Sequence, residues 1–342
     1  MPHIKTTAVQ RAASLMHLPP LLDELGVELR AVLDGTGVSV ADLRPDAYIP
    51  YASYLKILER SAELSRTPDF GLRLGARQTL EALGPLGRAM RHAATLGEAL
   101  EDFVAFQIGN STGGSTYLHR SGDDFAFGYG IYDPDTKPSR EMYDLVVAIG
   151  CSFIRDLTAG KAEPLEILII GREPADVAPY RALTTRPIRF DQRETCLILP
   201  RRVLKFPLET ADRAIRETIL SELSQRLLQA PWGMSSRVKH ALRSLMLTGA
   251  HSMRDVAAHL EIHPRTLRRA LKSEGTTFEA LKDEIRHAVA RQLLSMTQLP
   301  AADVGLSLGY STPSSFVHAF HRWSGMSPIQ WRHEKIGGPF RQ

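Results

Sequence analysis

The chain has 342 residues, of which 43% are hydrophobic and 23% charged, and its net charge is +4. This composition excludes disordered and fibrous proteins and allows two domains, each with its own hydrophobic core. The longest nearly apolar segment, residues 145–154, is about half as long as a membrane-spanning helix. Residues 1–15 also lack the features of a secretory signal. We therefore expect a cytoplasmic protein with no membrane partner.

The first 230 residues are expected to form a mixed α+β domain. Apolar residues recur at three- and four-residue spacing in residues 21–33, 51–64 and 86–106, which predicts helices. Residues 115–133 alternate around a turn at 121–124 and predict a β-hairpin. A helix over 142–160 is expected to end at Gly160. Strands within 165–171 and 187–200, and a short helix near 177–183, complete the domain.

A domain boundary is predicted near residues 229–236. Pro231 and Gly233 end the helical pattern of residues 211–229, and a new helix is expected to start at Ser236. We assign residues 1–230 to the α+β domain, 231–236 to a linker, 237–335 to an all-α domain and 336–342 to a tail.

Positive charge is concentrated behind this boundary. Residues 233–342 hold 15 Lys and Arg against 8 Asp and Glu, a balance of +7. Residues 1–232 hold 27 against 30, a balance of −3. The difference predicts that the C-terminal third binds a polyanion, although a solvated basic face would give the same count.

A short helical sequence occurs twice in the C-terminal third. Residues 255–275 (DVAAHLEIHPRTLRRALKSEG) align with residues 303–325 (DVGLSLGYSTPSSFVHAFHRWSG), at an offset of 48 that becomes 49 after the turn. Both copies end at a glycine, Gly275 or Gly325. Pro264 suits a first helical position, and Ser311 or Thr312 can cap the last helix of the second copy. Each copy is therefore predicted to form a helix-turn-helix.

The last helix of the first copy, about residues 264–274, has a basic face. Its apolar residues pack inward, so Arg265, Arg268 and Arg269 share the opposite face. Three guanidinium groups this close repel each other and suit a surface that binds phosphates and the guanine edge in the major groove. A solvated basic face is the alternative. The DNA contacts predicted for this helix are Arg265, Thr266, Arg268, Arg269 and Lys272.

The last helix of the second copy, about residues 312–323, has a small, polar and weakly charged face. Such a face suits hydroxyl, backbone and apolar contacts with bases and phosphates. We expect it to contribute more positioning, and the first copy more specificity. Between the copies, residues 279–296 predict one amphipathic helix that would hold two recognition helices about 34 Å apart, in adjacent turns of the major groove. The DNA contacts predicted for the second helix are Thr312, Pro313, Ser314, Ser315, His318 and His321.

The second copy runs into the sequence GMSPIQWR at residues 325–332. With both repeats and this ending, residues 236–335 resemble the DNA-binding domain of the AraC/XylS family of transcriptional regulators. The resemblance implies seven helices and a protein that usually activates transcription by contacting RNA polymerase. Positions 318 and 321, where Arg and Lys are common in the family, are His here. The family's base-contacting positions fall on Arg265, Arg268 and Arg269, and near Pro313, Ser314 and His318.

Two segments of the first domain, residues 83–100 (LGPLGRAMRHAATLGEAL) and 187–208 (PIRFDQRETCLILPRRVLKFPL), follow a mostly helical first third. With these features the domain resembles the effector-binding and dimerisation domain of one branch of the family, called arabinose-binding by name only. The resemblance implies a homodimer and a small-molecule effector whose chemistry the label does not identify.

Other candidate sites are weaker. The glycine-rich residues 109–116 precede a strand and lack the Lys-Ser/Thr of a phosphate-binding loop, so a flexible loop is expected. His259 and His263 lie four residues apart without a cysteine or carboxylate pair, so we expect no metal. Arg88, Arg91 and His92 could bind an anionic effector, but an exposed helix face is the favoured interpretation.

The expected architecture is an α+β effector-binding and dimerisation domain followed by an all-α DNA-binding domain, in which a long helix joins two helix-turn-helix motifs. The expected function is that of a sequence-specific transcription regulator, an activator that responds to an effector and needs no cofactor. The alternative is an N-terminal small-molecule enzyme with a regulatory DNA-binding tail. No convergent set of acid, base and nucleophile residues supports that alternative, so no catalytic residues are assigned.

Overall fold

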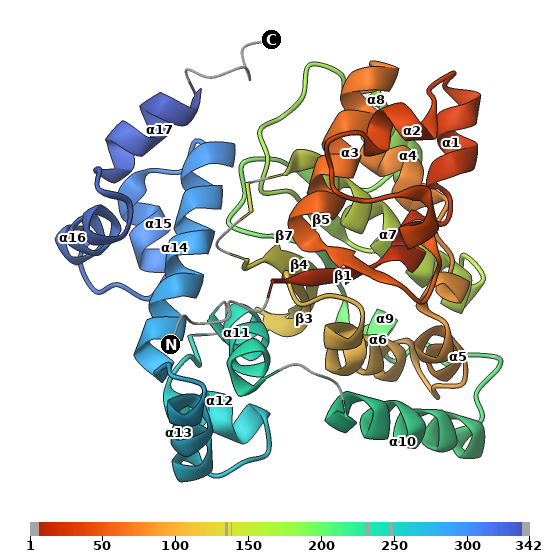
Figure 1. Ribbon diagram of the computed structural model, residues 1–342. Coiled ribbons are helices and arrows are strands. Elements are labelled where there is room, and N and C mark those ends of the chain that lie inside the picture. The colour runs from red at the N-terminus through yellow and green to blue at the C-terminus, as the bar shows by residue number, and fades with distance from the viewer. Residues whose placement is uncertain (1–6, 134–135, 138, 230–232, 247–248, 337–342) are drawn as a thin grey trace.

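Residues 7–229 form a lobe of helices around a β-sheet, and residues 233–336 form a second, helical lobe (Figure 1). The computed structural model describes residues 7–133, 136–137, 139–229, 233–246 and 249–336. Among these residues, no helix has the length and apolar character needed to cross a membrane. The predicted order, an α+β part followed by an all-α part, is confirmed.

The first third is mostly helical, as predicted. The helix predicted over 51–64 is confirmed, whereas the predicted segments 21–33 and 86–106 each form two shorter helices. Gly26 takes a left-handed conformation (φ 69°) between α1 and α2. Thr95 begins a new helix after α5 by accepting a hydrogen bond from the backbone N–H of Glu98. Two short strands that the sequence analysis missed, β1 (Val9–Arg11) and β2 (Tyr48–Pro50), pair antiparallel. The helices are α1 (Leu18–Glu24), α2 (Leu29–Leu33), α3 (Tyr51–Ser65), α4 (Phe70–Ala76), α5 (Pro85–Arg91) and α6 (Leu96–Phe106), with 3-10 turns η1 (Ala12–Leu15), η2 (Val40–Leu43), η3 (Leu80–Leu83) and η4 (Gln107–Gly109).

A five-stranded sheet has the order β3-β4-β7-β5-β6. The predicted hairpin is confirmed as β3 and β4, which pair antiparallel with Gly114 opposite Ile131. Every neighbouring pair is antiparallel except β5 and β6, which are joined through the helix α8 (Ala178–Leu183). The strands are β3 (Gly114–Ser121), β4 (Asp124–Ile131), β5 (Glu166–Leu168), β6 (Ile188–Arg189) and β7 (Thr195–Leu199).

Helix α7 (Arg140–Thr158) lies in the centre of this lobe, between the sheet and α4. Gly71 and Gly75 let α4 approach it closely, because a Cβ atom on either would lie 2.2–2.3 Å from a backbone oxygen of α7. The N–H of Gly71 donates to Glu141 Oε2 (2.7 Å). Burial is the main cause that raises the pKa of this carboxyl to about 8. Two helices are thus joined by backbone contact around a buried acid.

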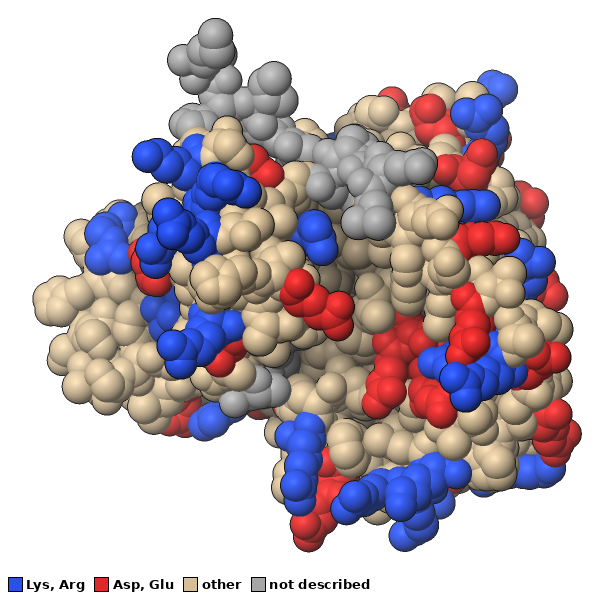
Figure 2. Space-filling view, turned by 90° about the horizontal axis from the view of Figure 1, so that it is seen from below, with Lys and Arg blue, Asp and Glu red and all other residues tan. Residues whose placement is uncertain are grey.

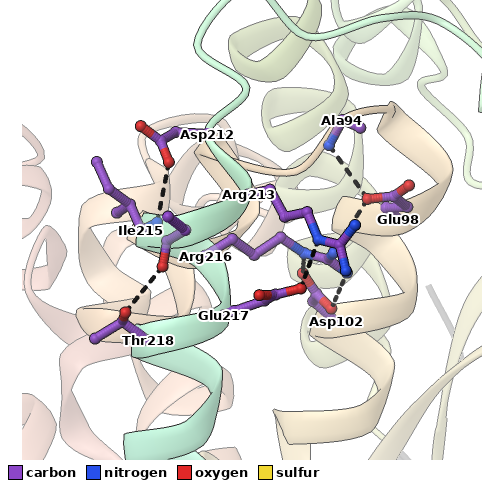
Figure 3. A network of polar contacts seen from close by, with 10 residues as sticks. Ala94, Glu98, Asp102, Asp212, Arg213, Ile215, Arg216, Glu217 and Thr218 are labelled. Carbon is purple, nitrogen blue, oxygen red and sulfur yellow. Dashed lines mark hydrogen bonds and ion pairs between the residues drawn. The ribbon is translucent and has the colours of Figure 1, made fainter.

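The lobe ends with α9 (Arg201–Leu204) and α10 (Arg213–Gln229), and α10 lies along α5 and α6 (Figure 1). Arg216 donates to both carboxylate oxygens of Asp102 on α6, at 2.7 and 2.9 Å. It also pairs with Glu98 (3.1 Å), so one guanidinium joins two acids (Figure 3). Bidentate pairs of this kind fix orientation as well as position. They hold the helix that leads into the domain boundary.

The second lobe consists, in its described residues, of helices only. Its first helix begins at Met234, two residues before the predicted Ser236 and inside the predicted linker 231–236. The earlier start has a physical cause: the Glu274 carboxylate accepts hydrogen bonds from the N–H groups of Met234 and Ser235, which are free at a helix N-terminus. The helices are α11 (Met234–Leu245), α12 (Met253–His259), α13 (Pro264–Ser273), α14 (Phe278–Met296), α15 (Ala301–Ser307), α16 (Pro313–Ser324) and α17 (Pro328–Ile336).

The two lobes meet where α11 and α14 pack against the β3–β4 hairpin and α7. The Tyr143 hydroxyl on α7 donates to Gln292 Oε1 on α14 (2.5 Å), and Gln292 Nε2 donates to the carbonyl of Ile131 (3.2 Å). Arg291 donates to the carbonyl of Thr136 (2.9 Å). Gln292 is 3% exposed, so this junction excludes water.

Arg243 on α11 is also buried in the junction, with 1% of its surface exposed. Its guanidinium lies against Gly130 of β4, where a Cβ atom would come within 2.2 Å of Arg243 Cζ. Among the described residues no carboxylate pairs with it, and Nε has no hydrogen-bond acceptor. One of the basic residues of the C-terminal third therefore faces the other lobe instead of solvent.

Candidate DNA-binding surface

The first helix-turn-helix is formed by α12 and α13. A capping box between Ser252 and Asp255 starts α12, because each side chain bonds the backbone N–H of the other. His263 Nδ1 accepts from the N–H of Arg265 (3.1 Å), and Pro264 takes the first position of α13, as predicted. Leu267 and Leu271 are buried and fix the orientation of α13. The rest of the helix is left to face outward.

The five residues predicted to contact DNA on α13 are all exposed. Within the described chain, none of the four basic side chains pairs with a carboxylate, and the one recorded side-chain contact is Arg268 Nη2 to Met253 Sδ (3.9 Å). In Figure 2, Lys and Arg side chains gather on the part of the C-terminal lobe that includes α13. An unpaired basic face of this kind suits phosphate and base contacts. The five residues are Arg265, Thr266, Arg268, Arg269 and Lys272.

The second helix-turn-helix is formed by α15 and α16. Of the two predicted caps, Thr312 is used: its Oγ1 accepts from the N–H of Ser315 (3.2 Å), and Pro313 takes the first helical position. The Ser315 side chain is half-buried, and its hydroxyl donates to the Thr312 carbonyl (2.8 Å). Ser315 thus takes part in the cap, while the other predicted contacts are exposed: Thr312, Pro313, Ser314, His318 and His321.

An aromatic cluster holds α16 in place. Phe316 and Phe320 are fully buried and pack against Tyr310 and Trp331. On the outer side of the helix, Arg322 pairs with Asp283 of α14 (3.0 Å). The region of α16, at the left edge of Figure 2, is largely uncharged. The first recognition helix therefore presents cations and the second presents hydroxyl, imidazole and apolar groups, as the sequence indicated.

Helix α14 connects the two motifs and matches the amphipathic helix predicted over residues 279–296. It packs directly against α15 and α16 of the second motif, and against α11, which in turn packs against α12 and α13 of the first. The five apolar residues predicted to line one side are all buried: Leu281, Ile285, Val289, Leu293 and Leu294. A continuous helix with a dry interface on both sides is rigid, so the two recognition helices keep a constant separation.

The weaker candidates have other roles. Residues 111–117 are buried, so the glycine-rich segment is a packed part of the lobe and the predicted flexible loop was wrong. Its small residues fit beneath Tyr51 and Tyr129.

Arg88 is exposed, and His92 Nδ1 contacts the Thr210 carbonyl (2.8 Å). Among the described residues, no three His, Cys, Asp or Glu side chains are grouped to hold a metal.

The sequence analysis missed a cavity inside the N-terminal lobe, between α7 and the sheet. Its lining is mostly apolar, and the volume open to the centre of a water-sized sphere is about 100 Å³. Residues from β1, α3, α7, β4 and β7 meet around it. Segments so far apart in the sequence leave no local pattern, so only the tertiary structure reveals this site.

Comparisons with known proteins agree with this arrangement. Residues 26–208 match the family described as the arabinose-binding domain of AraC transcription regulators, N-terminal, and residues 256–334 match a helix-turn-helix domain. The chain is 30% identical to the HTH-type transcriptional regulator VirS of Mycobacterium tuberculosis over 328 residues, which cover 94% of this chain and 96% of VirS. It is 26% identical to the ornithine utilization regulator of Pseudomonas aeruginosa, with 91% and 93% covered.

A solved structure, that of the transcriptional regulator CdpR from Pseudomonas aeruginosa, shares 29% identity with the chain. The match covers 80% of this chain and 91% of CdpR, with a TM-score of 0.42. VirS and the ornithine utilization regulator are both transcriptional regulators. The chain therefore belongs to the AraC family of DNA-binding transcription regulators, with an effector domain of the arabinose-binding type ahead of its helix-turn-helix domain.

Proposed function

We propose that this regulator reads DNA with two recognition helices, α13 and α16, inserted into adjacent turns of the major groove. The observation that carries the proposal is the face of α13, where three arginines are exposed and lack acidic partners among the described residues, while the opposite face is buried. Arginine forms two parallel hydrogen bonds with guanine, each such contact contributing about 1–3 kcal/mol of discrimination. Arg265, Arg268 and Arg269 are therefore assigned to base recognition, and Lys272 and Thr266 to phosphates.

Helix α16 contributes mainly positioning in this proposal. Thr312 and Ser314 stand at its N-terminus, where hydroxyls and free N–H groups suit phosphate contacts. His318 and His321 lie further along the exposed side. Val317 is 37% exposed on the same helix and suits apolar contact with a thymine methyl group. A single chain then binds an asymmetric site, because its two recognition helices, α13 and α16, present different side chains.

Selection of duplexes from a random pool by the full-length chain tests this assignment. Replacing Arg268 or Arg269 with Ala should relax base preference at one or two positions and weaken the selected site by about 1–3 kcal/mol. Arg226→Ala, an equally exposed arginine on α10, is the matched control and should leave the motif unchanged. The proposal fails if the unaltered chain binds selected and random duplexes equally tightly at physiological salt.

We further infer that residues 1–230 bind a small-molecule effector and form a homodimer, that residues 237–335 bind DNA, and that the dimer activates transcription through RNA polymerase. Support comes from the family and from the dry junction, which gives the effector domain direct contact with α14. An effector that changes this contact would change how the recognition helices of the two chains are placed on DNA. Sedimentation of the full chain with and without DNA checks the dimer, and a monomer under both conditions would remove this mechanism.

A further inference from the structure

The cavity of the N-terminal lobe has one apolar wall that is unusually open for the middle of a buried helix. Met142, Val146, Ile149 and Phe153 of α7 line it, at spacings of four, three and four residues. This spacing places them in one stripe along the helix. Val146 and Ile149 are only partly buried, although most of α7 is buried. The middle of the stripe thus borders the cavity, where apolar side chains would otherwise be packed.

Three glutamines that each have an unpaired carboxamide oxygen line the same cavity. Gln10, Gln78 and Gln107 line it, are at most 7% exposed, and have carboxamide oxygens without a partner among the described residues. Leaving a buried polar group unpaired costs about 1–3 kcal/mol. Three such oxygens around one cavity indicate a ligand that completes them.

For Gln78 and Gln10, the hydrogen bonds of the amide nitrogen show that the free atom is the oxygen. Gln78 Nε2 donates to the carbonyl of Ser14 (2.9 Å), which can only accept, so its Oε1 is the free atom. Gln10 Nε2 lies 3.3 Å from the Ser14 hydroxyl and points the same way. Gln107 belongs to the same end of the cavity, because its carbonyl accepts from the N–H of Ser111, the β-bridge partner of Gln10.

The charge of the ligand follows from these atoms and from Arg11. A carboxylate would face the lone pairs of three amide oxygens. A cation would be buried in an apolar space near a second cationic residue, Arg11, which also lines the cavity. A neutral hydroxyl or amide N–H satisfies the oxygens without either conflict. One water needs roughly 10–15 Å³ of the volume that is open to the centre of a water-sized sphere. The cavity therefore admits a molecule on the order of ten non-hydrogen atoms.

We propose that this cavity binds a neutral amphiphile, with hydroxyl or N–H donors at the glutamine end and an aliphatic or aromatic body along α7. This inference rests on the proposed function, since it names the chemical class of the effector of the N-terminal lobe. It assigns Gln10, Gln78 and Gln107 to recognition of the polar group, and Val146 and Ile149 to the apolar body.

Titration calorimetry of the full-length chain with four matched probes tests the proposal: octanamide, 1-octanol, octanoate and octylammonium. Octanamide and 1-octanol should bind at least tenfold more tightly than the two charged probes. Octanoate or octylammonium binding more tightly than the neutral pair overturns the proposal, and so does an absence of binding by all four.

Two pairs of variants locate the site. Ile149→Phe fills the cavity and should abolish binding, whereas Ile215→Phe, the same change at a 43% exposed position on α10, should leave it unchanged. Gln107→Leu removes an unpaired acceptor and should weaken octanamide binding about three- to tenfold without lowering the melting temperature of the free protein. Gln107→Glu should shift the preference to octylammonium. Unaltered binding by Ile149→Phe sinks the proposal.

Anisotropy with the selected duplex, recorded without probes, separates this result from the proposed function. Sequence-specific DNA binding together with failed probe binding refutes the ligand class alone. Probe binding together with non-specific DNA binding refutes the DNA-reading assignment alone.

Discussion

Arg243 provides a test of how the two lobes are held together. Its guanidinium is buried between α11 and β4, its Nε has no acceptor, and no described carboxylate offsets its charge. Burying a charge without a partner is costly, and an apolar residue of similar shape in such a place is often neutral or stabilising. We therefore predict that Arg243→Met stabilises the full chain.

The expected magnitude follows from two opposing contributions. Removing an incompletely paired polar group from a buried site gains about 1–3 kcal/mol. Losing the contact with the Tyr143 hydroxyl, which lies beside the guanidinium, lowers the free energy of unfolding by about 1 kcal/mol. Methionine keeps an unbranched chain against Gly130, so little void is created. The difference between these two contributions is a rise of about 0–2 kcal/mol in the free energy of unfolding.

Urea unfolding of the full chain, followed by circular dichroism and by tryptophan fluorescence, measures the change. Trp323 and Trp331 lie in the C-terminal lobe, and the sequence has no tryptophan before Trp232, so the two signals separate the lobes if they unfold apart. Arg254→Met, an exposed arginine on α12, is the control and should alter the unfolding free energy by less than about 0.5 kcal/mol. A loss of more than about 1 kcal/mol in Arg243→Met would show that the buried guanidinium stabilises the junction, and the reasoning would be refuted.

Three further predictions concern DNA and the interior. Lys272→Gln should weaken selected and random duplexes about equally and lower the slope of log affinity against log salt by about 1, whereas Lys272→Arg should keep the slope; a change in base preference would contradict the assignment. Leu267→Ala should lower the free energy of unfolding by about 2–5 kcal/mol in urea titrations, because this leucine is fully buried on the inner face of α13, and a loss below about 1 kcal/mol would argue against that packing. Glu141 has its pKa raised to about 8 in the folded chain, so the folded state holds a proton that the unfolded state releases above about 4.5, and stability is lost as the pH rises from about 4.5 to 8. Glu141→Gln cannot ionise, so its stability advantage over the unaltered chain should grow across that window and then level off; an advantage independent of pH would contradict the raised pKa.

The helix-turn-helix pair was predictable because its determinants are local. Pro264 and Thr312 lie at helix starts, Gly275 and Gly325 follow helix ends with φ near 75°, and apolar spacing shows which face is buried. These signals act over a few residues, so the sequence repeats them wherever the motif recurs. The hairpin at the β3–β4 turn was predictable for the same reason.

The short strands, the cavity and the junction depend on contacts between distant segments. Arg243 was counted with the basic residues that face a polyanion, because nothing in its neighbours distinguishes it from an exposed arginine. Residues 109–116 have the glycine content of a flexible loop, yet tyrosines from α3 and β4 cover them. The three glutamines of the cavity belong to β1, η4 and the segment after α4, and only folding brings them together.

Helix α7 has a consequence for communication through the molecule. Met142 lines the internal cavity and Tyr143, the next residue, bonds to Gln292 on the helix that spaces the two DNA readers. A 19-residue helix is about 28 Å long and moves as one body. A ligand that displaces α7 therefore also displaces the Tyr143 hydroxyl, which is one residue from the cavity lining. No flexible segment lies between the two residues. Helix α7, one hydrogen bond and helix α14 thus connect the cavity to the two recognition helices.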